Sequence, residues 1–161
     1  MKIDITPLQS LSLVCSGTAV LISSFAGETY NVMTASQCLA LPGREPFCVI
    51  AVERSHLTFE LIRKSGEFVV NVPHYGLLRE IIYCGTVSGR HRDKFISAPL
   101  TPVPSKALKP PSVKECIGHL ECTLQDIYEH DDIPLLIGRI VSASVDDTYF
   151  TAGHLDLRAI K

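Results

Sequence analysis

The chain has 161 residues and a formal charge of -2 from 15 basic and 17 acidic residues, and 46% of its residues are hydrophobic. This length is enough for one domain with its own core, so we expect a single domain over residues 1–161. The balanced charge gives no field that would attract nucleic acid or an anionic membrane. A small molecule or another protein is therefore the expected partner.

The cysteines and histidines show no arrangement typical of disulfides or metals. Histidines are scattered, which predicts no metal site, and no CxxC pair occurs among the six cysteines, Cys15, Cys38, Cys48, Cys84, Cys116 and Cys122. Such spacing is typical of reduced thiols in an intracellular protein. The first residues lack the pattern of a signal peptide, and no stretch approaches ~18 apolar residues. We therefore expect a cytoplasmic protein that does not contact membranes.

The first half of the chain predicts strands and one helix. Residues 18–25 are apolar and β-branched, and the turn at 26–28 leads into NVMTASQC (31–38), which predicts a hairpin. Another apolar run of strand length covers 46–53. A helix follows, with Leu57, Leu61 and Ile62 on one face, a start capped by Ser55 or Thr58, and an end at Gly66.

The second half predicts further strands around a proline-rich connection. Residues 68–73 form a strand that ends at Pro73, and 76–85 repeat helical spacing. Residues 97–112 hold five of the ten prolines, too many for a regular element. The stretch 119–124 alternates and pairs across a turn with 134–145. Because strands outnumber helices, we predict a mainly β fold, a closed or nearly closed antiparallel barrel with a few outer helices.

Two polar stretches could bind a ligand in the first half of the chain. In NVMTASQC, the small residues Thr34, Ala35 and Ser36 would let a flat ligand approach the backbone; the alternative is an edge strand with hydroxyls in water. In ERSHLTFE, Arg54 stands with two hydroxyls at a predicted helix N-terminus, which favours an anion such as phosphate. The alternative for ERSHLTFE is ordinary capping beside a solvated arginine.

Two more polar stretches follow. In FVVNVP, Asn71 interrupts an apolar strand, and a buried amide needs partners, either in a turn at the strand end or in a ligand. CGTVSGRHRDKF (84–95) combines glycines, hydroxyls and basic residues, which suits a loop that wraps an anionic ligand or a simple solvated turn.

The order and spacing of these four stretches, from about residue 18 to 145, resemble the flavin reductase-like family, which includes the flavoredoxins. The resemblance implies an FMN-binding split barrel, a Greek-key-like antiparallel β-barrel with a few outer helices. It also implies FMN as the cofactor. One departure is QCLALPGREPF, where relatives often carry an aromatic residue and a Pro-Pro pair, and the chain has no Trp.

The resemblance also implies roles for particular residues. The segment 31–36 would line the isoalloxazine ring, the 54–58 segment would hold the phosphate, Asn71 would face the flavin, and the Ser88-Gly89 loop with Lys94 would close over it. No side chain is expected to act as acid, base or nucleophile. The predicted cofactor-binding residues are Asn31, Met33, Thr34, Ala35, Ser36, Arg54, Ser55, Thr58, Asn71, Ser88, Gly89 and Lys94.

The function implied by the resemblance is an FMN-dependent oxidoreductase, a flavin reductase or flavoredoxin-like carrier, in a homodimer with the flavin near the subunit interface. Electrons would pass from NAD(P)H through FMN to an acceptor protein. The sequence has no GxGxxG fingerprint, so the nicotinamide would have to stack directly on the flavin. The alternatives are an FMN-binding module for storage or sensing without turnover, and an interaction domain with an empty pocket.

Overall fold

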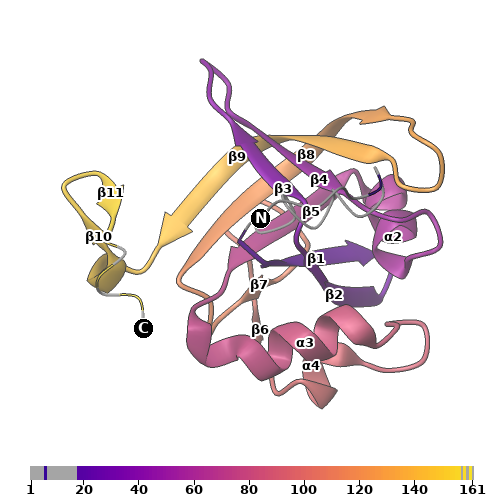
Figure 1. Cartoon of the computed structure of the whole chain (residues 1–161), viewed down its shortest axis with the longest axis horizontal. Helices are drawn as coiled ribbons and strands as arrows, with labels where there is room; N and C mark the ends of the chain where they lie inside the picture. The colour runs from indigo at the N-terminus through magenta and orange to yellow at the C-terminus, as the bar shows by residue number, and fades with distance from the viewer. Residues whose placement is uncertain (1–5, 7–17, 157, 159, 161) are drawn as a thin grey trace.

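The strands assemble into a seven-stranded sheet that curls into a barrel-like wall, with the order β2-β1-β5-β8-β9-β4-β3 (Figure 1). The computed structural model describes residues 6, 18–156, 158 and 160. Every neighbouring pair in the sheet is antiparallel. Its strands are β1 (Val20–Ala26), β2 (Thr29–Ala35), β3 (Cys38–Leu41), β4 (Phe47–Ala51), β5 (Glu67–Val72), β8 (Gly118–Tyr128) and β9 (Leu135–Val145). The predicted mainly β, antiparallel, barrel-like fold is confirmed.

Three helices pack against this sheet among the described residues, α2 with the apolar cluster of Ile22 and α3 and α4 with that of Leu21. The helix α2 (Leu57–Ser65) joins β4 to β5 and contacts β1 and β2. The helix α3 (Leu78–Thr86), preceded by the 3-10 helix η2 (Tyr75–Leu77), contacts β2, as does α4 (Lys94–Ser97) (Figure 1). The edge strand β2 is thus the strand that all three helices contact.

The ends of α2 only partly follow the sequence prediction. Gly66 ends the helix as predicted, in the left-handed conformation with φ 71°, and its N–H donates to the Ile62 carbonyl at 2.8 Å. At the start, His56 is the capping position, and its side chain accepts no hydrogen bond. Capping by Ser55 or Thr58 was a wrong prediction, because the Ser55 hydroxyl donates to Glu53 and the Thr58 hydroxyl accepts from Asn31.

Two apolar clusters cover the two faces of the sheet. Successive residues of a strand point to opposite faces, and on β1 this places Ile22 in one cluster and Leu21 in the other. Phe68 and Leu136 belong to the cluster of Ile22, whereas Phe95 belongs to that of Leu21. The second cluster includes residues of α3 and α4, so those helices bury apolar side chains against the outer face.

The proline-rich connection contains more regular structure than predicted. Two short strands, β6 (Pro102–Val103) and β7 (Ser112–Val113), pair antiparallel within it. The buried Glu121 carboxylate on β8 also accepts hydrogen bonds from three consecutive backbone N–H groups of residues 106–108, at 2.7 to 2.9 Å. A proline can stand in a short strand at a position where no backbone N–H has to donate to the neighbouring strand. The expectation that this connection contains no regular element was therefore wrong.

The C-terminal part beyond β9 forms a small separate hairpin. The 3-10 helix η3 (Asp147–Tyr149) leads into β10 (Phe150–Thr151) and β11 (His154–Leu155), which pair only with each other. Figure 1 shows this hairpin projecting away from the curled sheet. Phe150 and Leu155 leave large apolar side chains exposed there.

Candidate functional site

A cavity of about 180 Å³ lies where β2, the start of α2, the end of α3 and the loop after α3 meet. The predicted site residues that line it are Asn31, Met33, Thr34, Thr58, Ser88, Gly89 and Lys94. They come from three of the four polar stretches, which lie far apart in the sequence. The fold therefore brings most of the predicted ligand-binding residues into one place, which we call the β2 cavity.

One wall of the β2 cavity is fixed by a contact between β2 and α2. The Asn31 amide donates from Nδ2 to the Thr58 hydroxyl at 2.7 Å, and both side chains are buried. Gly89 lies directly over this pair, because a Cβ added there would stand 2.1 Å from Asn31 Oδ1. Only a glycine fits at this close approach, so the loop and the strand close the wall together.

The opposite wall is fixed by a contact between β2 and α3. The Thr34 hydroxyl donates to the Ile81 carbonyl at 2.5 Å. Gly85, inside α3, lets the helix approach, since a Cβ there would lie 3.3 Å from the Thr34 Cβ. The helix ends at Thr86, one residue beyond the segment 76–85 for which the sequence predicted helical spacing.

Lys94 is the charged residue of the β2 cavity. Its side chain is only 5% exposed, and its Nζ donates to the Cys84 carbonyl at 2.9 Å. None of the ion pairs among the described residues includes it. Burial lowers the Lys94 pKa, because desolvation disfavours the ammonium form. A buried cation without a carboxylate is costly unless a ligand supplies negative charge or hydrogen-bond acceptors.

The thiol of Cys84 does not supply that negative charge. Cys84 is buried and lines the same cavity. Burial raises the pKa of its thiol to about 11, so the sulfur is protonated at neutral pH. The residues that line the cavity therefore offer Lys94 neither a carboxylate nor a thiolate.

Arg54 and Ser55 lie outside the β2 cavity, whereas Thr58 lies within it. The Arg54 guanidinium pairs with the Glu129 carboxylate and donates from Nε to the Asp131 carbonyl at 3.0 Å. The Ser55 hydroxyl donates to Glu53 at 2.6 Å. The three residues predicted to hold one phosphate are thus divided between two places.

Asn71 is 0% exposed and does not line the β2 cavity. Its Nδ2 donates to the Leu21 carbonyl and the Ser23 hydroxyl, both at 3.0 Å, and its Oδ1 accepts from the Val113 N–H at 2.8 Å. The amide thereby ties β5 to β1 and β7. The hydrogen-bond partners of the Asn71 amide thus lie within the protein. This arrangement gives no support to the predicted contact between Asn71 and the flavin.

Ala35 and Ser36, at the end of β2, also lie off the cavity. Ala35 is buried in the cluster of Ile22 and pairs with Val20 of β1. Ser36 is exposed and donates to the Gln37 side chain at 3.0 Å. The small size of Ala35 serves packing between strands in this arrangement.

The cavity includes residues that the sequence prediction did not select, namely His56, Leu57, Cys84, Gly85, Thr86 and Val87. All of them stand inside the two stretches already singled out, ERSHLTFE and CGTVSGRHRDKF. Because β2 packs between α2 and α3, it is the ends of both helices that supply these additional residues. The sequence could have indicated these residues if each stretch had been taken as a whole, and not only its polar side chains.

The described cysteines are free thiols. They are Cys38, Cys48, Cys84, Cys116 and Cys122, whereas Cys15 lies outside the described residues. The sulfur atoms of Cys38 and Cys48 lie 3.5 Å apart without a disulfide bond. A hydrogen bond with Cys122 and burial raise the pKa of Cys48 to about 12. The Cys48 thiol is therefore protonated and a poor nucleophile at neutral pH.

The described part of the chain offers neither a metal-binding cluster nor a membrane-spanning helix. No group of three or more histidine, cysteine or acidic side chains there has the arrangement of a metal site. No helix there has the length and apolar character needed to cross a membrane.

Comparison with known proteins gives concordant matches in sequence and structure. The model of the flavin reductase like domain matches residues 11–156. An uncharacterized protein of Archaeoglobus fulgidus is 38% identical over 122 residues, which cover 76% of this chain and 69% of that protein. Flavoredoxin from Methanosarcina acetivorans has a TM-score of 0.84 at 26% identity, covering 99% of this chain and 83% of that one.

A further structural match is the FMN-binding domain of a flavin reductases-like enzyme from Shewanella baltica OS155. Its TM-score is 0.82 at 25% identity, with 98% of this chain and 83% of that chain covered. The curled sheet with its outer helices is the split-barrel fold. The chain belongs to the flavin reductase like family, which confirms the resemblance drawn from its sequence.

Proposed function

We propose that this protein is an FMN-binding oxidoreductase, a flavin reductase or flavoredoxin-like electron carrier, with its flavin site at the β2 cavity. The observation that carries the proposal is Lys94, a buried ammonium group without a carboxylate partner among the described residues. FMN offers acceptors for such a group in its phosphate and its ring carbonyls. Family membership and FMN-binding relatives support the choice of ligand.

The residues of the cavity fit part of a flavin rather than the whole. Ligand pockets commonly measure ~300–1,000 Å³, whereas the β2 cavity has about 180 Å³. Met33 and Leu57 offer apolar surface, and Thr34 and Thr58 offer hydroxyls, although both hydroxyls already bond within the protein. We propose that the rest of the cofactor lies outside this cavity and is covered by a second copy of the chain in a homodimer.

The roles of the chain's own residues follow from their contacts. Lys94 would hold the negatively charged or carbonyl-bearing part of the cofactor, and Met33 would contact an apolar part. Gly89 would let the loop close over the Asn31–Thr58 pair and exclude water. When bound, FMN supplies the redox chemistry, accepting two electrons from NAD(P)H and releasing them to an acceptor.

An anaerobic titration of FMN-loaded protein with NADH and NADPH tests this proposal. Loss of the yellow colour at about one equivalent of reduced nicotinamide, without added enzyme, is the expected result. Bound FMN that neither nucleotide bleaches would favour the storage or sensing module. A folded protein that binds no FMN would refute the proposal outright.

A further inference from the structure

A basic groove of about 430 Å³ lies beside α2, next to the β2 cavity. It is lined by Arg54, Phe59, Glu60, Arg63, Lys64 and Arg90. Four of these six side chains are cationic and one is a carboxylate, although the whole chain has a formal charge of -2. The positive charge is therefore a local feature of this surface.

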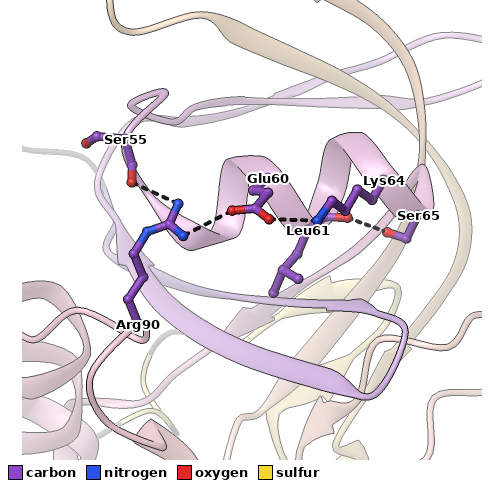
Figure 2. Close-up of polar contacts among 6 residues, drawn as sticks. All are labelled: Ser55, Glu60, Leu61, Lys64, Ser65 and Arg90. Carbon is purple, nitrogen blue, oxygen red and sulfur yellow. Dashed lines mark hydrogen bonds and ion pairs between the residues drawn. The ribbon is translucent and has the colours of Figure 1, made fainter.

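Glu60 holds two of the cations in fixed positions along α2. Its carboxylate accepts from Lys64 Nζ at 2.7 Å and from Arg90 Nη1 at 3.0 Å, and Arg90 also donates to the Ser55 carbonyl at 3.4 Å (Figure 2). Hydrogen bonds from Lys64 first, and from Arg90, lower the pKa of Glu60, so the carboxylate stays ionised at neutral pH. Arg90 is thereby anchored from its loop onto the helix.

The two remaining cations flank an aromatic ring. The guanidinium carbons of Arg54 and Arg63 lie 5.7 and 5.9 Å from the centroid of the Phe59 ring. Arg54 is paired with Glu129, whereas no ion pair within the described residues includes the exposed Arg63. Four cations therefore face two carboxylates, and the groove retains positive charge for an anionic ligand.

The basic groove and the β2 cavity are lined by neighbouring residues of the same two segments. At the start of α2, Leu57 and Thr58 line the cavity, and the groove is lined by Phe59, Glu60, Arg63 and Lys64 of the same helix. On the loop after α3, Gly89 lines the cavity and Arg90 lines the groove. The same two segments of the chain therefore contribute residues to both places.

We propose that the basic groove binds the diphosphate of the reduced nicotinamide dinucleotide, whose nicotinamide reaches the flavin at the β2 cavity. This inference rests on the proposed function. The chain has no GxGxxG fingerprint, so the diphosphate has no glycine-rich helix start of the dinucleotide-binding kind to receive it. Guanidinium groups suit phosphate oxygens because their N–H donors bind in pairs.

Steady-state kinetics of the FMN-loaded protein test the groove with NADPH, NADH and reduced nicotinamide mononucleotide, which lacks the adenylate and the diphosphate. We expect Arg63→Gln and Lys64→Gln each to raise KM for the dinucleotides roughly five- to tenfold. KM for the mononucleotide should not change. Arg79→Gln, which alters an exposed arginine outside the cavities described, is the matched control.

A second measurement separates failure of the groove from failure of the proposed function. Calorimetric titration with ADP-ribose needs no turnover, and we expect binding that weakens roughly five- to tenfold in Arg63→Gln and falls with added salt. That result supports the groove even if no nucleotide bleaches the flavin. No binding of ADP-ribose to the folded wild type would overturn the inference.

The phosphate of FMN is also an anion that the basic groove could bind, so it must be distinguished from the diphosphate of the nicotinamide dinucleotide. Titrating FMN and riboflavin into apoprotein of Arg63→Gln and Lys64→Gln does so. Unchanged affinity for both flavins supports the nicotinamide assignment. Selective loss of FMN binding would overturn it and assign the groove to the flavin phosphate.

Discussion

At the scale of single residues, substitution of Lys94 tests whether this side chain binds a ligand or stabilises the fold. An ammonium group that is buried beside neutral atoms costs stability in the absence of ligand. We expect Lys94→Met to leave the free energy of unfolding of the apoprotein unchanged or to raise it by up to about 2 kcal/mol. The same change should weaken FMN binding roughly tenfold or more.

Urea denaturation of the apoprotein and fluorescence titration with FMN measure the two effects of Lys94→Met. Arg79→Met provides a control for loss of an exposed cation. A fall in both stability and FMN affinity would show that Lys94 is a structural residue.

The pH dependence of stability follows from the lowered pKa of Lys94. Between its folded pKa and its unfolded value of about 10.4, the folded state binds fewer protons than the unfolded state, so stability rises with pH. We therefore expect any stability deficit of the wild-type apoprotein relative to Lys94→Met to shrink as pH approaches ~10. Parallel denaturation curves at several pH values measure this difference, and a constant deficit would contradict the assigned shift.

The sequence located about half of the cavity residues, because three of its four polar stretches meet at the cavity. It could not assign Asn71, since a buried amide looks the same whether its partners are backbone groups or a ligand. Nor could it place Arg54, whose partner Glu129 is distant in sequence and meets it only through the β8–β9 turn. Both depend on long-range contacts that no local pattern encodes.

At the scale of elements, Asn71 joins three strands. Asn71→Ala would leave the Val113 N–H and the Leu21 carbonyl without their side-chain partner in a buried region. We expect a loss of roughly 2–4 kcal/mol in the free energy of unfolding, with FMN binding by the folded fraction retained. Chemical denaturation and FMN titration measure the two quantities, and selective loss of FMN binding at unchanged stability would assign Asn71 to the ligand.

Element types were predictable where the pattern was local. The β1–β2 hairpin, the end of α2 at Gly66 and the pairing of β8 with β9 follow turn chemistry and alternation. The pairing of β6 with β7 was not predictable, because two-residue strands carry no periodicity and prolines argue against them. The predicted capping of α2 by Thr58 was wrong for a similar reason, because the Thr58 hydroxyl accepts a hydrogen bond from Asn31 of β2, a residue distant in sequence.

At the scale of the whole molecule, we infer that residues 1–161 form one domain, and we propose that it pairs as a homodimer. Large apolar side chains remain exposed on β3 and on the C-terminal hairpin, including Leu39 at 59% and Phe150 at 43%. We propose that a second copy covers these side chains and also the part of the flavin that lies outside the β2 cavity. Sedimentation of the FMN-loaded protein should give about twice the mass of 17.7 kDa, and a flavin-bound monomer would contradict this.

The most direct test of the central claim is a titration of the apoprotein with FMN, followed by quenching of flavin fluorescence, with wild type and Lys94→Met side by side. We predict about one FMN bound per chain in the wild type and clearly weaker binding in the variant, because Lys94 is the buried cation of the β2 cavity. Equal FMN affinity in the two proteins, both folded, would contradict a flavin site at this cavity.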